Sequence, residues 1–231
     1  TAAASEWVGQ LISGVKALHQ KDVAHLCLGP LTVAMDSAAA LHVGDFLGKV
    51  KALHLLEHSW CGEPDVLWAA WYPREVHIRI AEGGNAAAAQ AGAQDLDGFR
   101  VDAWQLGVLI FYLLTGEHLF GSLRAPGAVC HNILADRRVN EPLLERLPLF
   151  ADLVARLTAG DAQQRLLPAS ADSHPLLWPL ARAVRSVSQL PGFEEEQLQA
   201  PAESWDWLRH LPAFAVLGGA SAPAAPVSLA A

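Results

Sequence analysis

The side chains best suited to chemistry lie close together in the first part of the chain. His25 and Cys27 are separated by one residue, Thr32 follows, and Asp45 stands directly before Phe46. Histidine can exchange a proton near neutral pH, a thiolate is a nucleophile, and a carboxylate can ligate a metal ion. Each also has a structural alternative: His25 could brace a loop, Cys27 could be buried and inert, and Asp45 could cap a turn. Because no serine or aspartate stands at the spacing of a catalytic partner, we expect His25 to be structural.

A strongly apolar helix later in the chain is the element that must hold these side chains in place. Residues 106–114 are apolar on every face of a helical wheel, which is typical of a helix buried on all sides. The run is about half the roughly twenty residues that a membrane span needs, so we expect a core helix. Asp102 stands near its start, where a carboxylate is favoured by the helix dipole and can accept backbone N–H groups. Gly116 is suited to end the helix.

The rest of the chain contains further helical and strand patterns. Apolar residues recur at helical spacing from Ser5, which is suited to be the N-cap, to His19, and again over residues 142–157. Short strands are expected near residues 31–45. Residues 81–95 form a low-complexity insertion that we expect to be a mobile surface loop, and residues 218–231 form a tail, rich in Gly, Ala, Ser and Pro, that we expect to be disordered.

The composition is that of an ordinary globular protein with a slight excess of apolar residues. The chain has 231 residues, of which 52% are hydrophobic and 17% charged, and its formal net charge is −8. That acidic balance argues against a general nucleic-acid-binding surface, which would be basic. The three cysteines have neither paired nor zinc-ligand spacing, which suits a reducing compartment. The sequence starts without a secretory signal pattern, and it has no initiator Met, which is compatible with a piece of a longer protein.

The loop residues resemble the catalytic segments of the protein-kinase superfamily. In that family the catalytic loop runs His-Arg-Asp-Leu-x-x-x-x-Asn, and the metal-binding loop is Asp-Phe-Gly. Here the stretch His25-Leu-Cys-Leu, followed by Pro30, takes the place of His-Arg-Asp-Leu. Thr32 falls at the Asn position, and Asp45 begins an Asp-Phe pair eighteen residues after Cys27 (45 − 27), the spacing usual in the family.

This resemblance also implies that the catalytic positions are altered. In the family the catalytic-loop aspartate accepts the proton of the substrate hydroxyl, while the asparagine and the Asp-Phe-Gly aspartate hold magnesium. Cys27, at the aspartate position, is a poor acceptor as a neutral thiol. Thr32, at the asparagine position, has no carbonyl ligand, and Leu47 replaces the glycine of the metal loop. Asp45 alone keeps a magnesium-binding side chain, and without the other ligands it is a weak metal site.

Three charged residues match positions that brace the kinase C-lobe. Asp102, in a Val-Asp-Ala-Trp stretch, resembles the start of the family's central helix. The stretch Trp-Tyr-Pro-Arg-Glu-Val resembles the end of the activation segment, which places Glu75 at the family's glutamate. The stretch Asp-Ala-Gln-Gln-Arg resembles Asp-Pro-x-x-Arg, which makes Arg165 the expected buried partner of Glu75. The resemblance further implies that Asp102 accepts hydrogen bonds from the backbone around His25 and Leu26.

The end of the matching region narrows the resemblance to one branch of the family. His174-Pro-Leu-Leu-Trp, preceded by Phe-Gly and Asn-Ile-Leu, is similar to the endoplasmic-reticulum unfolded-protein-response sensor kinase/endoribonuclease and its relative ribonuclease L. In that branch the kinase lobe continues into a helical nuclease domain. The resemblance implies a mainly α, kinase-like C-lobe with a few short strands over residues 1–178, and the start of a nuclease-like helical extension over residues 179–217.

Three functions are compatible with this pattern. The first is a degenerate, pseudokinase-like module with a regulatory or dimerising scaffold role in a stress sensor, which the residues Cys27 and Thr32 favour. The second is a working Ser/Thr kinase of which this chain is a C-lobe fragment. The third is part of a ribonuclease-type receptor whose RNA-cleaving residues lie outside the chain. Because the family's N-lobe has no counterpart here, we expect this chain alone to be inactive and to bind no cofactor, although the parent family uses ATP and magnesium.

The expected partners are proteins. They are a second copy of the chain, or the N-lobe and nuclease portions of a longer parent chain. We expect no direct nucleic-acid binding and no membrane segment within these residues. The expected location is the cytoplasm, including the cytosolic face of the endoplasmic reticulum if a longer parent chain is anchored there.

Overall fold

The fold is organised around helix α6, which the sequence pattern predicted from its apolar run. In the computed structural model α6 spans Gly98–Thr115 and is buried from Val101 to Phe111. Asp97 caps its start by accepting from the N–H of Phe99, and Gly116 ends it in the left-handed conformation at φ 74°, where glycine is favoured. The predicted core helix is confirmed, and it begins a few residues earlier than expected.

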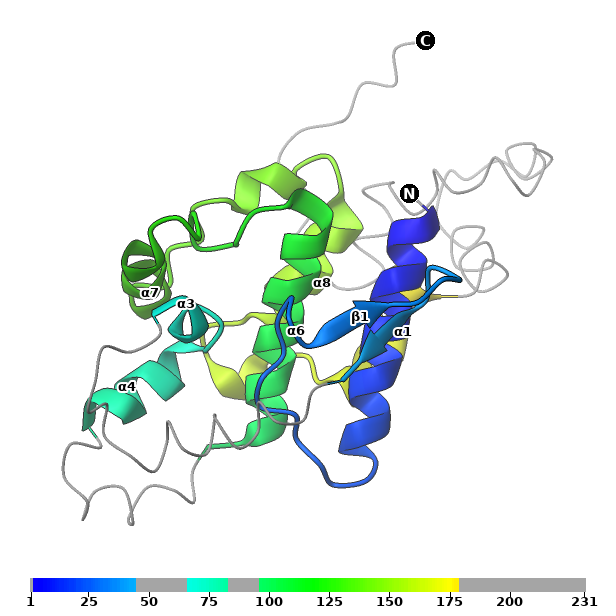
Figure 1. Ribbon diagram of the computed structural model, residues 1–231, viewed down its shortest axis with the longest axis horizontal. Helices are drawn as coiled ribbons and strands as arrows, with labels where there is room; N and C mark the ends of the chain where they lie inside the picture. The colour runs from blue at the N-terminus through cyan, green and yellow to red at the C-terminus, as the bar shows by residue number, and fades with distance from the viewer. Residues whose placement is uncertain (1, 45–65, 83–95, 179–231) are drawn as a thin grey trace, which may run out of the picture.

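The structure describes residues 2–44, 66–82 and 96–178, which form a mainly helical fold with one two-stranded sheet (Figure 1). The predicted fold class is confirmed, and the arrangement is consistent with a kinase C-lobe-like fold. The described elements other than α6 are α1 (Ala2–His19), β1 (Val33–Met35), β2 (Leu41–Val43), α3 (Val66–Ala69), α4 (Arg74–Glu82), α7 (Pro126–Leu134), η1 (Glu141–Leu144), α8 (Pro148–Leu157), η2 (Ala162–Gln164), η3 (Pro168–Ser173) and η4 (Pro175–Leu177).

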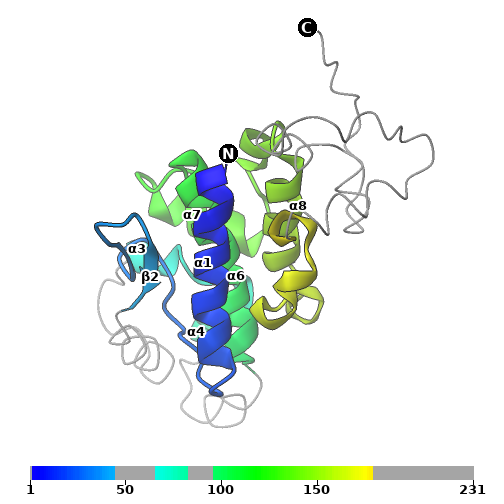
Figure 2. The same cartoon turned by 90° about the vertical axis from the view of Figure 1, so that its right-hand side faces the viewer.

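Helices α1 and α8 both pack on α6. Figure 2 shows α6 behind α1. Close contact with α8 depends on Gly107. A Cβ atom there would lie 2.6 Å from Cγ2 of Thr158 and 2.8 Å from Cβ of Leu157, closer than such contacts allow. On the other side α1 buries Leu11 and Val15 completely. The central helix is therefore held on two faces by apolar packing.

Two of the predicted helix boundaries are wrong. Helix α1 begins at Ala2, so Ser5 lies inside the helix and is buried rather than acting as its N-cap. The predicted helix over residues 142–157 is two elements, the 3₁₀ helix η1 and the α-helix α8. The separation follows from Pro148, whose ring fixes φ and lacks an N–H, so it is suited to the first turn of a helix and not to the interior.

Strands β1 and β2 form an antiparallel hairpin with Val33 opposite Val43. Its turn is closed by Asp36, whose Oδ1 accepts from the N–H groups of Ala38 and Ala40. The hairpin is tied to α1 because the N–H of Leu41 donates to Gln10 Oε1 at 2.8 Å. The predicted strands near residues 31–45 are confirmed. Gly44 alone separates the end of β2 from Asp45 in the sequence.

Several expectations fall on parts of the chain outside the described residues. They concern Asp45 and Leu47, residues 179–217 as a nuclease-like extension, and residues 218–231 as a tail. Of the expected insertion 81–95, only the first two residues are described, and they end α4. Among the described residues, no helix is both long enough and apolar enough to cross a membrane.

Candidate functional site

Asp102 is the anchor of the loop that resembles a catalytic loop. Its Oδ2 accepts from the N–H of His25 at 2.7 Å, and its Oδ1 accepts from the N–H of Leu26 at 2.6 Å. The carboxylate is completely buried, so these charge-assisted bonds satisfy two backbone donors that water cannot reach. Leu26 has a φ of 62°, a left-handed conformation that is unfavourable for a branched residue and is held here by the bond. The contact predicted for Asp102 is confirmed.

His19 is a third partner of Asp102 that the sequence reasoning missed. Its Nε2 lies 2.9 Å from Asp102 Oδ2, and its ring lies 4.5 Å from that of Phe99. His19 is the last residue of α1, so this contact joins the end of α1 to the start of α6. The sequence shows only that His19 is a polar residue at the end of an apolar helical stripe, and this does not identify Asp102 as its partner.

His25 is placed to brace the loop against the end of β2. Its Nδ1 accepts from the N–H of Cys27 at 3.3 Å, and its Nε2 lies 3.0 Å from the carbonyl oxygen of Gly44. A carbonyl only accepts, so we assign the proton to Nε2. The imidazole is fully buried and both nitrogens are engaged. This geometry suits the structural role expected of His25, and it leaves no free nitrogen for proton transfer.

Cys27, at the position of the family's catalytic aspartate, is enclosed. The residue is 2% exposed, and its thiol lies beside the buried Tyr72. Burial is the main cause that raises the pKa of the Tyr72 hydroxyl far above its usual value, and the neighbouring Cys27 and Asp102 raise it further. Tyr72 is therefore a neutral phenol at physiological pH. The thiol has a buried neighbour in place of the open space that a substrate hydroxyl would need.

Thr32, at the position of the magnesium-binding asparagine, uses its hydroxyl locally. Its Oγ1 donates to the carbonyl oxygen of Gly29 at 3.0 Å and accepts from the N–H of Gly29 at 3.0 Å. The residue is 2% exposed. Its backbone continues this pattern, because the carbonyl of Thr32 accepts from the N–H of Gly44 at 2.9 Å. The side chain closes a turn and joins the loop to the strand end, which leaves it poorly placed as a metal ligand.

Gln105 is a second residue that the sequence reasoning missed. It lies about one helical turn after Asp102 and faces the same loop. Its Oε1 accepts from the N–H of Leu28, and its Nε2 donates to the carbonyl of Trp71, both at 3.0 Å. Gln105 is fully buried, and a buried amide is stable only when it is hydrogen-bonded. A glutamine within a buried apolar helix predicts that its amide is hydrogen-bonded, but it does not identify Leu28 or Trp71 as the partners.

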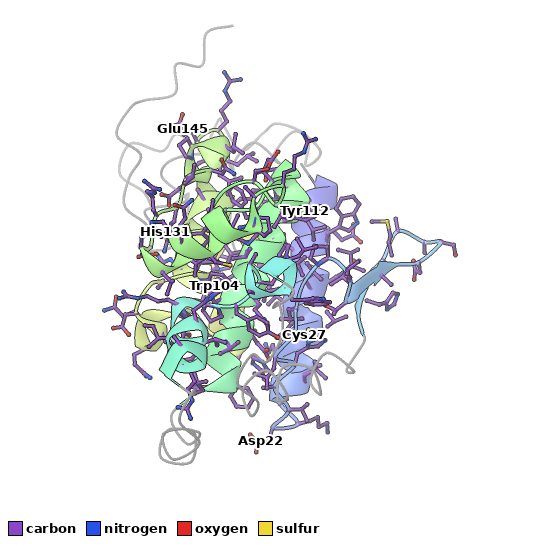
Figure 3. The ribbon with its side chains drawn as sticks, turned by 60° about the vertical axis from the view of Figure 1, so that its left-hand side comes forward. Asp22, Cys27, Trp104, Tyr112, His131 and Glu145 are labelled. Atoms are coloured by element: carbon purple, nitrogen blue, oxygen red, sulfur yellow. The ribbon has the colours of Figure 1, made fainter. Side chains whose placement is uncertain are left out.

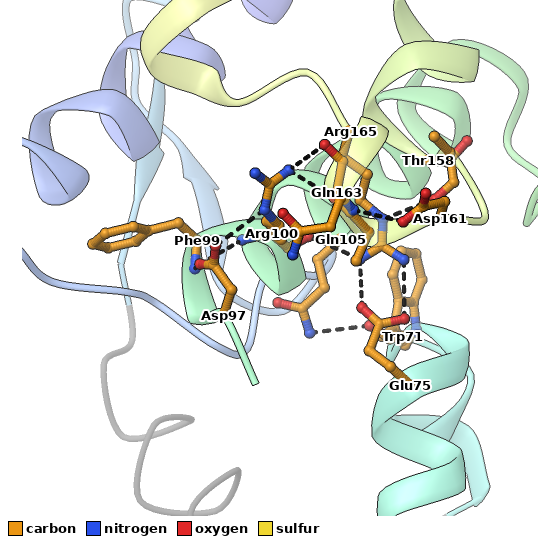
Figure 4. Close-up of polar contacts among 12 residues, drawn as sticks. Trp71, Glu75, Asp97, Phe99, Arg100, Gln105, Thr158, Asp161, Gln163 and Arg165 are labelled. Carbon is orange, nitrogen blue, oxygen red and sulfur yellow. Dashed lines mark hydrogen bonds and ion pairs between the residues drawn. The ribbon is translucent and has the colours of Figure 1, made fainter. Parts of the chain in front are cut away.

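Glu75 and Arg165 form the predicted ion pair (Figure 4). The pair is bidentate: Arg165 Nη2 donates to Glu75 Oε2 at 2.9 Å, and Nη1 donates to Oε1. Arg165 also donates to the carbonyls of Ala159 and Arg100, and thereby connects α4 to α6 and to the loop after α8. The Arg165 side chain is 1% exposed and that of Glu75 is 27% exposed. The pair is thus asymmetric, with a buried cation and a partly hydrated anion.

The described residues provide a framework more clearly than a reaction centre. No cluster of three or more His, Cys, Asp or Glu side chains suited to a metal ion occurs within the described ranges. Asp45, the expected magnesium ligand, lies outside them, directly after Gly44. Cys27 and Thr32 come together with His25 in one loop, as predicted, but each is turned toward protein.

Comparison with known proteins places the chain beside serine/threonine kinases. No family model matches it. It is 31% identical over 119 residues to the CBL-interacting serine/threonine-protein kinase 7 of Arabidopsis thaliana, an alignment covering 50% of this chain and 23% of that protein. It is 24% identical over 183 residues to the probable serine/threonine-protein kinase irlD of Dictyostelium discoideum, covering 79% and 11% respectively. The MAP kinase kinase kinase wis4 of Schizosaccharomyces pombe is 22% identical over 170 residues, covering 73% and 12%.

These similarities support a protein-kinase-like assignment at low sequence identity. The chain spans only 11 to 23% of the length of these relatives. The names of the relatives say nothing of a nuclease or a stress-sensor role. Those finer assignments therefore remain proposals, as do the activity, substrates and partners of any whole protein.

Proposed function

We propose that this chain is the C-lobe part of a protein-kinase-like module in which the phosphotransfer positions have become structural, and that it acts as a regulatory or dimerising scaffold. One observation carries the proposal. Cys27 and Thr32, the residues at the positions of the catalytic base and the second magnesium ligand, are each 2% exposed and engaged with neighbouring protein groups.

Loss of these two positions is sufficient to suppress phosphoryl transfer. The reaction depends almost wholly on positioning the phosphates and stabilising their charge. A positioned general base alone contributes about 10²–10⁴ in rate. A buried thiol cannot replace it, and a threonine hydroxyl bonded to Gly29 offers magnesium a weaker ligand than an amide carbonyl.

The test is a pair of activity assays, run on the purified chain and on the product of its full-length reading frame. Radiolabelled ATP with a basic-protein substrate measures phosphotransfer, and a labelled stem-loop RNA measures cleavage, each with magnesium or manganese. We expect no turnover in either assay. Phosphotransfer that follows the protein through purification and disappears in Asp45→Ala would contradict the proposal.

The scaffold role makes a separate prediction about assembly. Sedimentation velocity over a wide concentration range should show a reversible increase in mass if the chain dimerises. A sedimentation coefficient that stays at the monomer value across that range would contradict the dimerising role.

The second candidate function is an active Ser/Thr protein kinase of which this chain is a fragment. The specific observation in its favour is that the relatives reported above carry that description. Because this chain alone is expected to be inactive under either candidate, the ATP assay distinguishes them on the product of the full-length reading frame. Turnover there that depends on Asp45 supports the kinase, and its absence supports the scaffold.

A finer proposal links the chain to the kinase/endoribonuclease branch of the family. It is supported by the His174–Trp178 motif, which makes specific contacts. His174 Nε2 lies 2.8 Å from Asp152 Oδ2 on α8, and Trp178 Nε1 donates to the carbonyl of Ser173 at 2.8 Å. The motif therefore fixes the chain against α8 where residues 179 onward begin. The full-length reading frame tests this link, since a complete nuclease segment downstream supports it and an unrelated segment contradicts it.

A further inference from the structure

A pocket beside Arg165 is lined by none of the residues at the catalytic positions. Its volume is about 360 Å³, a size that accepts one large side chain or a small molecule. Three apolar side chains from α6, α7 and the segment between them form one part of its wall, and charged side chains form the other. The lining residues are Arg74, Trp104, Phe120, Ile133, Asp136, Gly160, Asp161 and Arg165.

The aromatic wall carries an unused hydrogen-bond donor. Trp104 is 3% exposed and stacks on Phe120 with the ring centroids 5.6 Å apart. Figure 3 shows Trp104 on α6, on the side of the molecule that carries α7. Its indole N–H has no acceptor among the residues that the structure describes, although buried tryptophans usually find one. The pocket therefore offers a donor, together with two aromatic rings, to whatever occupies it.

Two carboxylates, those of Asp136 and Asp161, also belong to the lining. A Cβ atom on Gly160 would lie 2.7 Å from Asp136 Oδ2, so the Asp136 carboxylate lies over the residue next to Asp161. Asp136 Oδ1 is 3.8 Å from Arg138 Nε, beyond hydrogen-bond distance. Asp161 uses only Oδ1, which accepts from the N–H of Gln163 at 2.9 Å. Most of the acceptor capacity of both carboxylates is unused by the described residues.

The two arginines of the lining differ in what they can bind. Arg165 already donates to Glu75 and to two backbone carbonyls, so its charge is neutralised within the protein. Arg74, at the start of α4, is exposed and forms no ion pair with any described residue. Asp136 is ion-paired with Arg138 at 3.8 Å, so the charges without an ion pair among the described residues are those of Asp161 and Arg74. The unused carboxylate oxygens of Asp136 and Asp161 favour a cationic group that donates several hydrogen bonds, with an acceptor nearby for Arg74.

We propose that this pocket binds an arginine side chain of a partner peptide. The planar guanidinium has five donors and can bridge the carboxylates of Asp136 and Asp161 while its face lies against an aromatic ring. The carbonyl groups of the peptide then accept from the indole N–H of Trp104 and from Arg74. This site is independent of the proposal made above about phosphotransfer, because none of these residues occupies a catalytic-loop position.

The test follows the indole N–H of Trp104 by two-dimensional ¹H–¹⁵N NMR. The chain has eight tryptophans, so this resonance is first assigned in the sequence. The probes are Ac-Gly-Arg-Gly-NH₂, the same peptide with lysine or with neutral citrulline, and free L-arginine. We expect saturable displacement with the arginine peptide and weaker binding with lysine, whose single ammonium cannot bridge two carboxylates. Citrulline should give no displacement. Free arginine presents an α-ammonium that Arg74 repels and an α-carboxylate that Arg74 attracts, so it should bind less tightly only because it lacks the peptide carbonyls that accept from the indole N–H of Trp104.

Isosteric variants test the roles of the carboxylates. Asp136→Asn keeps a residue that tolerates the left-handed φ of 49° at this position, and Asp161→Asn keeps a cap for η2, so both should fold. Each should weaken binding of the arginine peptide at least tenfold, while Glu145→Gln, an exposed carboxylate outside the pocket, should leave it unchanged. The proposal is overturned if the Asn variants bind like the parent, if citrulline binds as well as arginine, or if free arginine binds more tightly than the peptide.

Discussion

The Glu75–Arg165 pair and the loop from His25 to Thr32 are both fastened to α6, but they resemble the kinase family to different degrees. The pair keeps the two charged residues that the family motif calls for, and it has the bidentate geometry expected of them. The loop keeps the histidine and changes both residues that would take part in phosphotransfer. Yet the two regions are similarly well bonded to the backbone around them.

This difference separates what the fold requires from what catalysis requires. Buried backbone groups and buried charges must be satisfied whatever the protein does, and Asp102, Gln105 and Arg165 meet that requirement. A catalytic base and a magnesium ligand must instead remain available to a substrate. In the loop, Cys27 and Thr32 are buried and engaged within the protein, so they meet the first requirement and not the second.

The largest expected effect tests whether the framework region is as important to stability as this comparison implies. Glu75→Ala should lower the free energy of unfolding by about 3–5 kcal/mol, because it leaves the buried Arg165 charge uncompensated. Arg165→Ala leaves a carboxylate that water partly reaches, but it also removes the bonds to the carbonyls of Ala159 and Arg100, so a large loss is expected there too. The double variant should lose less than the sum of the two, since the second change removes the stranded charge. Urea denaturation of the three variants measures this coupling.

Arg146→Ala is the matched control for that cycle. Arg146 is exposed and has no ion-pair partner among the described residues, so its removal should change stability by less than about 0.5 kcal/mol. Costs of the two single variants that simply add would show that the side chains do not stabilise one another.

The sequence predicted most of this framework because its signals are local or tied to a motif. The apolar run gave α6, and Gly116 gave its end. The contacts of Asp102 with the backbone near His25, and of Glu75 with Arg165, followed from the resemblance of short motifs, and the structure contains both. The roles proposed for these residues in function stay predictions.

Most of the features that were missed depend on tertiary contacts that no short pattern records. Nothing in the sequence around His19 or Gln105 specifies that one meets Asp102 and the other joins Leu28 to Trp71. The break before α8 was missed because the apolar spacing continues across it, although Pro148 marked the boundary. The enclosure of Cys27 beside Tyr72 likewise arises from the packing of distant segments.

A smaller effect is expected from restoring the family's residue in the loop. Cys27→Asp introduces a carboxyl group at a position that is 2% exposed, so we expect a loss of about 2–4 kcal/mol at pH 7 and no gain in phosphotransfer. The loss should diminish as the pH falls toward 5, because the buried carboxyl is then protonated more easily. Cys27→Ser, a neutral change of similar size, is the control and should cost about 1 kcal/mol. A Cys27→Asp variant as stable as the parent would show that the loop still accommodates a catalytic aspartate.

The smallest expected effect is a change in how stability depends on pH, through His118, which packs beside Trp71. Trp71, whose carbonyl is bonded to Gln105, packs edge-on against His118 with ring centroids 5.1 Å apart. Burial lowers the pKa of His118 from 6.5 to about 4. Between pH 6.5 and pH 4, His118 is mostly protonated in the unfolded chain and mostly neutral in the folded protein. The stability that His118 contributes is therefore complete above pH 6.5 and is lost as the pH falls toward 4.

We accordingly expect the parent protein to lose about 2 kcal/mol between pH 7 and pH 5 through His118 alone. His118→Asn keeps an acceptor near the N–H of Phe120, which now donates to His118 Nδ1 at 3.3 Å. The variant should be less stable at pH 7, because it loses the contact with Trp71, but its stability should fall less steeply with acid. His131→Asn, an exposed histidine on α7, should keep the parent slope. Denaturation of all three proteins at pH 7, 6 and 5 measures the slopes. If His118→Asn and the parent lose stability in parallel, protonation of His118 does not cause the loss of stability in acid.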